Sequence, residues 1–546
     1  MGRPPRPTAG CARSAPSRRA PSRTACSLHD AGACRSCPDL ARPLPEQLAA
    51  KQAQVAGLLA DGPAPVARDT WLPPAGSAPT GFRNKAKMAV SGSVSAPVLG
   101  LADRFGGSLD LRGCPLHVDA IQESLPVLGQ LVTGLGLEPY HIAADRGELK
   151  YLLLTASPTG ALMVRWVLRS HRHVGTLRRA LPRIRRALPQ LEVMSANIQP
   201  VRQAVLEGEE EILLGLAEGM SDRLQMDLLL PAQDVPGRPE GRKAEETVLP
   251  LLLPTRSFFQ TNTAVAEELY ATARQWAAQW ASRRRADAGW ADAGRAGGGQ
   301  VTTRRAGTGR ATGGQVAGAG QVTTGWAGGR TSAGQVATRR AGTGRATGGR
   351  TGAGQAGASS ERGAVPLRLW DLFCGVGGFA LALASHPALH GAQVRGVELS
   401  APAIHGAQAS ARLMGLDPRR VWFEAGDARV LDPRSGDVPD LLVVNPPRRG
   451  IGPDLAQRIE ASGVGRVLYS SCNPSSLVSD LAAMPSLRVR RARLFDMFPH
   501  TGHAEVLVEL GRSGSGGGRD GRSRGLRAGW PEPGGTTSAP RGAATY

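Results

Sequence analysis

The chain has 546 residues, enough for two or three folded domains, and 41% of them are hydrophobic, so much of it can bury a core. Its formal net charge of +21 lies almost entirely in residues 1–24, 283–363 and 511–546, and the remainder is close to neutral. This distribution favours solvated basic segments over a folded domain built to bind nucleic acid. The absence of any run of about 18 apolar residues excludes a membrane-spanning helix.

Residues 1–25 are rich in Arg, Ser and Pro and contain no acidic residue. This composition predicts a disordered basic tail, with an organelle transit peptide as the alternative. No apolar segment follows, which argues against a secretory signal. The chain has seven cysteines, an odd number, so we expect a reducing compartment, the cytoplasm, and no disulfides.

A cluster of three cysteines opens the first folded region, in "CSLHDAGACRSC". With Cys114 of "LRGCPLH", they give the spacing C-x7-C-x2-C, a long gap and C, formed by Cys26, Cys34, Cys37 and Cys114. Four thiolates can hold either a tetrahedral zinc ion or an iron–sulfur cluster, and spacing alone does not separate the two. Cys11 lies in the basic tail and is expected to be a free thiol.

Residues 26–282 form the first predicted domain. They contain strand-like runs, "KYLLLTAS" and "ALMVRWVLRS", and then a helical stretch, "AVAEELYATARQWAAQW". Strands and helices alternate without one dominant period, which predicts an α+β fold.

Residues 283–363 have low complexity and repeat "TRRAGTGRATGG" at 303–314 and 338–349. They have no apolar periodicity and are dense in Gly, which predicts a flexible insert without a core. Because loop-closure entropy rises slowly with length, this insert need not prevent the flanking regions from assembling. We predict that residues 511–546, also Gly-rich, form a disordered tail.

Residues 364–510 alternate short apolar strands, "LRLWDLF", "AQVRGVEL", "DLLVVN" and "RVLYSS", with helical stretches. This order predicts parallel strands joined by crossover helices, a doubly wound α/β sheet.

The first strand of this region leads into a Gly-rich turn and a helix, "LWDLFCGVGGFALALA", in which Gly375, Gly377 and Gly378 allow close backbone approach to a ligand. Glu398 ends the next strand, where a carboxylate can bind ribose hydroxyls. The pattern predicts a nucleoside-containing cofactor, and its spacing departs from G-x-G-x-x-G, which counts against a dinucleotide. A plain tight turn is the alternative. Asp427, after the third strand, is a candidate for contacting an adenine amino group.

The fourth strand ends in "VVNPPRRG", which places Asn445 and two prolines at the edge where open α/β sheets bind ligands. Asn-Pro-Pro also suggests an amino-group methyltransferase. Those enzymes usually carry an aromatic residue next, whereas Arg448 and Arg449 follow here.

Cys472 comes just past the fifth strand, in "VLYSSCNPSSL", and is a candidate nucleophile on the same edge. A buried structural thiol is the alternative, but the polar neighbours argue against simple burial. Glu505 begins a later strand, in "DMFPHTGHAEVLVEL", and is a candidate general base, or else a surface charge. Cys374, in the Gly-rich turn, is expected to be a small packing residue.

Taken together, these motifs resemble the bacterial 23S rRNA uracil-C5 methyltransferases, class I enzymes that use S-adenosyl-L-methionine (SAM). The resemblance rests on "DLFCGVGGF", "VVNPPRRGIG", "YSSCNP" and "LFDMFPHTGHAEVL", and on the upstream "GFRNKAKMAVSGS", "RGELKYLLLT", "NIQPV" and "RSFFQTN". It covers nearly all of residues 26–282 and 364–510. Within the family it is greatest with the members that act on uracil-747, which lack the RNA-binding TRAM domain that precedes the cysteines in other members.

The resemblance implies a role for each site residue. The SAM contacts would be Gln260, Phe373, Glu398 and Asn445. Cys472 would be the nucleophile that adds to C6 of the uracil, and Glu505 the base that removes the C5 proton. The cysteine cluster would hold a [4Fe–4S] cluster in preference to zinc.

The resemblance also implies 23S rRNA as the partner, no membrane, and a Rossmann-like methyltransferase domain at 364–510 after an RNA-binding domain at 26–282. The target uridine would have to leave its stack to reach the thiol. Five basic residues are candidates for holding RNA phosphates, with solvated charges as the alternative: Arg83, Lys85, Lys87, Arg448 and Arg449. A monomer is favoured.

Three other functions remain open at this point. One is C5 methylation of a tRNA uridine by the same chemistry. The second is amino-group methylation, which would not need Cys472. The third is a non-catalytic RNA-binding protein that retains a methyltransferase fold.

Overall fold

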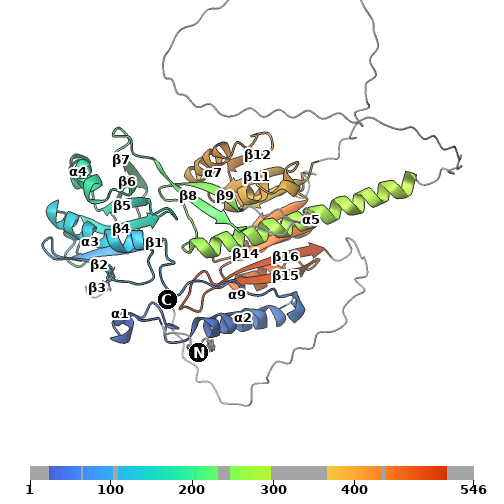
Figure 1. Ribbon diagram of the computed structural model, residues 1–546, viewed down its shortest axis with the longest axis horizontal. Coiled ribbons are helices and arrows are strands. Elements are labelled where there is room, and N and C mark those ends of the chain that lie inside the picture. Colours follow the sequence, from blue (N-terminus) through green and yellow to red (C-terminus); the bar gives the residue numbers. More distant parts are fainter. Residues whose placement is uncertain are drawn as a thin grey trace, which may run out of the picture. The chain divides into compact units, whose positions relative to one another are not determined.

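The computed structural model describes residues 24–62, 65–102, 108–202, 205–231, 246–296, 366–432 and 437–512 (Figure 1). The chain divides into two units, residues 1–282 with 366–546, and residues 283–365. Most of the three segments predicted to be disordered lies outside the described residues. Within the described ranges, no helix is long and apolar enough to cross a membrane.

One seven-stranded sheet is built from the C-terminal part of the chain. Its strands are β10 (Arg368–Leu372), β11 (Gln393–Glu398), β12 (Val421–Ala425), β13 (Leu441–Val444), β14 (Arg466–Ser471), β15 (Leu487–Phe495) and β16 (Glu505–Arg512). Their order is β12-β11-β10-β13-β14-β16-β15. The first five strands in that order are parallel, and β16 runs antiparallel to both of its neighbours. The predicted α/β class is confirmed, with a sheet that is mixed at one end.

Helices cover both faces of this sheet and share separate apolar cores with it. On one face lie α5 (Thr263–Ala296), α6 (Gly378–Ala384), α7 (Ala401–Leu413) and the hairpin of β8 (Arg223–Leu230) and β9 (Thr247–Pro254). On the other face lie α2 (Leu44–Ala60), α8 (Gly452–Ser462) and α9 (Pro474–Ala482). The boundary expected after residue 282 lies inside α5. The core on the α5 face contains residues from both predicted domains, 26–282 and 364–510. The division into these domains stays a prediction.

A second sheet occupies residues 85–214. Its order is β3 (Ser108–Asp110), β2 (Pro97–Ala102), β1 (Lys85–Gly92), β4 (Leu149–Ala156), β5 (Leu162–Leu168), β6 (Leu191–Ile198) and β7 (Glu210–Leu214). All neighbours are antiparallel except β5 and β6, which are joined across α4 (Val174–Ala187). Both α4 and α3 (Asp119–Gly134) pack their apolar residues on one face of the sheet. The short elements are α1 (Ser27–Asp30) and the 3-10 turns Arg68–Thr70, His171–His173, Pro387–Leu389 and Ala428–Val430.

The N-terminal helix α2 is fastened to the loop between β15 and β16. Lys51 and Asp496 form an ion pair with an Nζ–Oδ1 distance of 2.6 Å, and both side chains are almost fully buried. The Lys51 ammonium also donates to the carbonyl of Phe498 at 2.9 Å. The Gln47 amide receives the His500 backbone N–H at 2.8 Å and reaches His500 Nδ1 at 3.2 Å. The loop that leads into Glu505 is thus held by residues near the other end of the chain.

The two sheets are joined at Asn84, immediately before β1. Its amide donates to the Gln260 carbonyl at 2.9 Å and to the Thr263 hydroxyl at 2.8 Å, and its backbone N–H donates to the Thr261 carbonyl at 3.0 Å. The segment "FFQTN" is thereby fixed at the start of α5, where Gln260 is buried.

Replacing Lys51 with Met should leave the Asp496 carboxylate buried and unpaired. We expect a loss of about 3–5 kcal/mol in the free energy of unfolding, measured by urea denaturation. The double variant K51M/D496L should recover much of that loss because no charge stays buried. The control R112M breaks a partly exposed pair with Asp110 and should cost less than about 1 kcal/mol. Equal losses for K51M and R112M would contradict the prediction.

Candidate functional site

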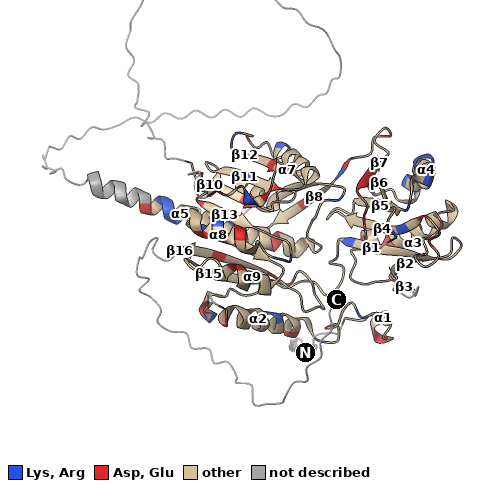
Figure 2. Ribbon diagram, turned by 180° about the vertical axis from the view of Figure 1, so that it is seen from behind, with Lys and Arg blue, Asp and Glu red and all other residues tan. Residues whose placement is uncertain are grey.

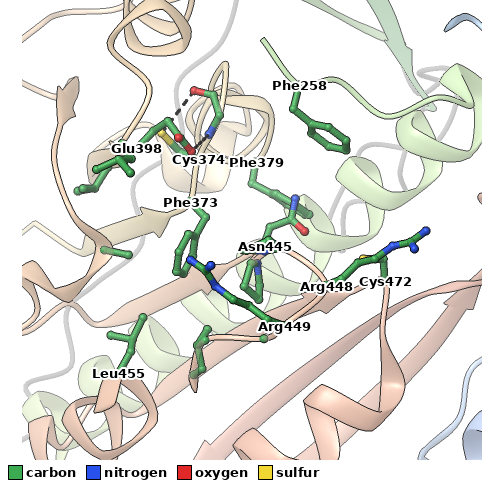
Figure 3. A pocket seen from close by; sticks show the side chains of 18 of the residues that line it. Phe258, Phe373, Cys374, Phe379, Glu398, Asn445, Arg448, Arg449, Leu455 and Cys472 are labelled. Carbon is green, nitrogen blue, oxygen red and sulfur yellow. Dashed lines mark hydrogen bonds between the residues drawn. The ribbon is translucent and has the colours of Figure 1, made fainter. Parts of the chain in front are cut away.

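One cavity of about 920 Å³ opens at the carboxyl ends of the parallel strands (Figure 3). Its lining includes all six residues that the resemblance assigned to chemistry or cofactor binding, namely Gln260, Phe373, Glu398, Asn445, Cys472 and Glu505. Strand β10 lies between β11 and β13, so the strand order reverses at this point. Open α/β sheets bind ligands at such a reversal.

The Gly-rich turn after β10 forms one wall of the cavity. Phe373 has a left-handed backbone with φ of 62°, and Gly375 and Gly377 have φ of 55° and 85°. The turn brings the Gly375 N–H within 3.2 Å of one Glu398 carboxylate oxygen, while the Ser400 N–H donates to the other at 3.0 Å. Each oxygen keeps a lone pair for a further donor, so Glu398 can still accept ligand hydroxyls.

Helix α5 closes this wall through Tyr270. A Cβ atom on Gly378 would lie 2.6 Å from the Tyr270 ring, so only glycine fits where α6 begins. The same ring meets Phe379 edge-on, with centroids 4.9 Å apart. Sequence reasoning identified this stretch as helical but missed Tyr270, because the pattern does not show which side of α5 faces a ligand.

Asp427 lines the cavity as expected, but its carboxylate already has a partner. The Arg429 guanidinium donates to it at 2.9 Å, and this hydrogen bond lowers the pKa of Asp427 to about 2. Two exposed apolar side chains, Phe258 and Leu399, also line the cavity and were not anticipated.

The other end of the cavity holds Cys472, Glu505 and Arg448. Burial raises the pKa of the half-buried Cys472 thiol, and Glu505 raises it further, whereas Arg448 lowers it. Figure 3 shows the Arg448 side chain beside Cys472. Glu505 is 2% exposed and accepts a hydrogen bond from the Ser470 hydroxyl. Burial raises the pKa of Glu505 to about 7.

The loop that carries Arg448 is anchored to α9. The Asn473 amide donates to the Arg448 carbonyl at 2.8 Å, and its oxygen caps α9 by accepting from the Ser475 N–H. The buried Asp480 carboxylate accepts the N–H groups of Ile451 and Gly452 at 2.9 and 3.1 Å. Asp480 was not predicted from the sequence, because its partners lie far from it along the chain.

The four clustered cysteines line a second cavity of about 240 Å³: Cys26, Cys34, Cys37 and Cys114. Burial, followed by the three neighbouring thiols, raises the pKa of Cys37 to about 11. In the described residues, no three His, Cys, Asp or Glu side chains are arranged to hold one metal ion. Cys374 is buried in the turn after β10, and Cys11 lies outside the described residues.

The five predicted RNA contacts fall into two groups. Arg448 and Arg449 line the large cavity, whereas Arg83 and Lys87 line the cysteine cavity. Lys85 is half-buried, and burial lowers its pKa to about 8.

Comparisons with known proteins agree with this geometry. A family model described as tRNA (Uracil-5-)-methyltransferase matches residues 438–513. The 23S rRNA (uracil(747)-C(5))-methyltransferase RlmC of Escherichia coli strain K12 is 37% identical over 487 residues, covering 89% of this chain and 99% of the relative. The protein of the same name from Serratia proteamaculans strain 568 is also 37% identical, over 89% of this chain and 100% of the relative.

A solved structure shares the fold. It is the Pyrococcus abyssi tRNA (uracil-54, C5)-methyltransferase in complex with S-adenosyl-L-homocysteine, with a TM-score of 0.54 and 17% identity. The match covers 87% of this chain and 85% of that one.

Two substitutions should move the pKa of Cys472 in opposite directions. E505Q removes a carboxylate that raises this pKa, so the pKa should fall; R448M removes a cation that lowers it, so it should rise. The measurement is the pH dependence of iodoacetamide alkylation, read by mass spectrometry on the peptide that contains Cys472. R449M, in the same loop, is the control and should leave the profile unchanged. Shifts in the same direction would refute the arrangement.

Proposed function

From the premise that this chain belongs to the family of RlmC-type 23S rRNA (uracil-C5)-methyltransferases, as 37% identity over 89% of its length shows, we propose that it methylates C5 of a uridine in 23S rRNA. The resemblance seen in the motifs is thereby confirmed. The target uridine would be uracil-747, the base named for the relatives. The observation that carries the proposal is that one cavity is lined by Cys472, by Glu505 and by the four residues expected to contact SAM.

The residues of the cavity fit SAM. A volume of about 920 Å³ suits a ligand of this size. Glu398, at the end of β11, has free acceptor capacity for the two ribose hydroxyls, and the Gly-rich turn allows close approach of the backbone. Gln260, Phe373 and Asn445 complete the set of residues that would hold it. When bound, SAM supplies an electrophilic methyl group.

Cys472 starts the reaction by adding its thiolate to C6 of the flipped-out uracil, which forms a C–S bond and turns C5 into a carbon nucleophile. Arg448 favours the thiolate, because its positive charge lowers the pKa of Cys472. After C5 has taken the methyl group, Glu505 removes the C5 proton. The electrons then re-form the C5–C6 double bond, and the C–S bond breaks, releasing Cys472.

Glu505 suits the role of base for two reasons. Its pKa of about 7 gives a carboxylate that is largely ionised just above neutral pH and is basic enough to accept a proton. The Ser470 hydroxyl donates to the carboxylate and restrains its orientation.

We propose a [4Fe–4S] cluster on the four clustered cysteines. Support comes from the cavity of about 240 Å³ that the four thiols line, because an iron–sulfur cluster needs space between its cysteines. A single zinc ion, with Zn–S bonds of about 2.3 Å, would instead hold the four sulfurs close together around one point. The cluster would tie residues 26–37 to the turn at Cys114, and so would have a structural role. Asp39, two residues past Cys37, donates its N–H to the His500 carbonyl at 3.1 Å, which connects this segment to the loop before Glu505.

A covalent trap tests the reaction. With SAM and a hairpin of the target region that carries 5-fluorouridine, the protein should form a stable adduct visible in the intact mass, because fluorine at C5 cannot leave as a proton does. C472A should form none, and C11A should form it normally. E505Q should accumulate an adduct even with ordinary uridine, since the C5 proton stays in place.

The outcomes separate the alternatives. An adduct with a tRNA stem-loop, and none with the rRNA hairpin, would support the tRNA enzyme. If calorimetry shows SAM binding but no uridine-containing RNA forms an adduct, the proposal fails in favour of amino-group methylation or RNA binding alone.

The cluster has its own test. Protein purified without oxygen should contain about four iron and four sulfide per chain, and C114S should lose both. C374S is the matched control and should retain the iron, because Cys374 lies in the turn after β10 and does not line the cysteine cavity. One zinc per chain with no sulfide would contradict the assignment.

A further inference from the structure

A basic surface lies on α4, outside both cavities. In Figure 2 the ribbon of α4 carries the blue of Lys and Arg over much of its length. The basic face of α4 consists of five exposed arginines: Arg178, Arg179, Arg183, Arg185 and Arg186. Residues 171–190 contain no Asp or Glu. None of the five arginines lines the large cavity or the cysteine cavity.

Helical geometry separates these arginines from the apolar side of α4. Leu177, Leu181 and Ile184 are buried in the core of the second sheet and recur every three or four residues. The arginines of the helix occupy the remaining positions and point to solvent. Because the apolar side is already buried, α4 has no apolar surface to insert into a lipid membrane, as a membrane-surface helix would need.

Among the described residues, the arginines of α4 also differ from several others in having no acidic partner. Arg165 pairs with Glu211 at 2.7 Å, and Arg493 pairs with Glu268 at 3.2 Å. Within the described residues, no ion pair is found for the five arginines of the basic face. Arg183 and Arg185 reach only backbone carbonyls, each at 3.3 Å. The basic face therefore presents uncompensated positive charge to a partner.

We propose that the basic face of α4 binds the phosphate backbone of 23S rRNA outside the stem-loop that carries the target uridine. The inference rests on the proposed function, which makes a polyanion the substrate. Arginine is suited to phosphate because its planar guanidinium can donate two parallel hydrogen bonds to phosphate oxygens. Such contacts carry no sequence information, but they add affinity and fix orientation. The target base would then be recognised in the large cavity, and the surrounding rRNA on α4.

The test compares two RNAs and several full-length variants. R178Q/R179Q/R183Q/R185Q/R186Q removes the charge, and the same five positions changed to Lys retain it. Binding to a transcript of the whole rRNA domain and to the minimal stem-loop is measured at several salt concentrations, together with methylation of both. Thermal melting shows whether each variant is folded, and exposed positions of this kind should change stability little.

On the domain transcript, the Gln variant should bind at least about tenfold more weakly at ~150 mM salt, and its salt slope should fall by about 1 for each phosphate that the variant no longer neutralises. The Lys variant should stay near wild type, and methylation of the stem-loop should be unchanged in both. Matched double variants control for total charge. R179Q/R183Q should weaken binding, whereas R112Q/R223Q should not, because Arg112 and Arg223 are each paired with an Asp.

Two results would overturn the inference: an unchanged salt slope in the Gln variant, or equal losses of affinity for the domain and the stem-loop. A different result would separate it from the proposed function. If the wild type binds the domain through these arginines but methylates no RNA, the proposed function fails while the basic face of α4 stands as an RNA-binding surface.

Discussion

The shared edge at which β10, β11, β13 and β14 end is the constraint on which the site depends. Parallel neighbouring strands all end at the same edge of a sheet. The residues that follow these strands are therefore brought close together by the sheet, and not by contacts with one another. Phe373, Glu398, Asn445 and Cys472 each follow or end one of these strands. Although they are spread over about a hundred residues of sequence, they line one cavity because their strands lie side by side in one sheet.

The antiparallel strand β16 brings Glu505, the proposed base, to the same edge in the opposite way. Because β16 runs against β14, its first residue, and not its last, lies at the carboxyl edge. Val506 pairs with Ser471, so Glu505 lies one position further along, on the side of Cys472, and the Ser470 hydroxyl donates to its carboxylate. The mixed sheet is therefore a requirement of the site, since a parallel strand in this position would carry its first residue to the far edge.

The sequence was informative where function depends on residues that follow strands. Three segments each follow an apolar strand, so their positions at the edge of the sheet could be predicted. They are the Gly-rich turn, the Asn-Pro-Pro segment and the Cys-Asn-Pro segment. Glu505 could be named as a candidate base from its place at the start of a strand, but only the family resemblance favoured that role over a surface charge, because nothing local shows that its strand is reversed. Three features could not be predicted, because each joins residues that are distant along the chain and leaves no periodic pattern in the sequence. They are the Lys51–Asp496 ion pair, the orientation of Tyr270 toward the cavity, and the hydrogen bonds that Asp480 accepts. The placement of α2 against the sheet of β10 to β16 was missed for the same reason.

The ion pair between Lys51 and Asp496 also bears on the order of events during synthesis. Its partners are 445 residues apart, so α2 leaves the ribosome long before the loop that neutralises its lysine exists. Until then the apolar side of α2, including Val55 and Leu59, has no sheet to pack against. The apolar residues of α2 are therefore exposed on the growing chain, where chaperones can bind them and where they favour aggregation. The large cavity can be completed only after β16 has been synthesised, because β16 lies between β14 and β15 and begins with Glu505. A nascent chain that ends before Glu505 contains Cys472 without it.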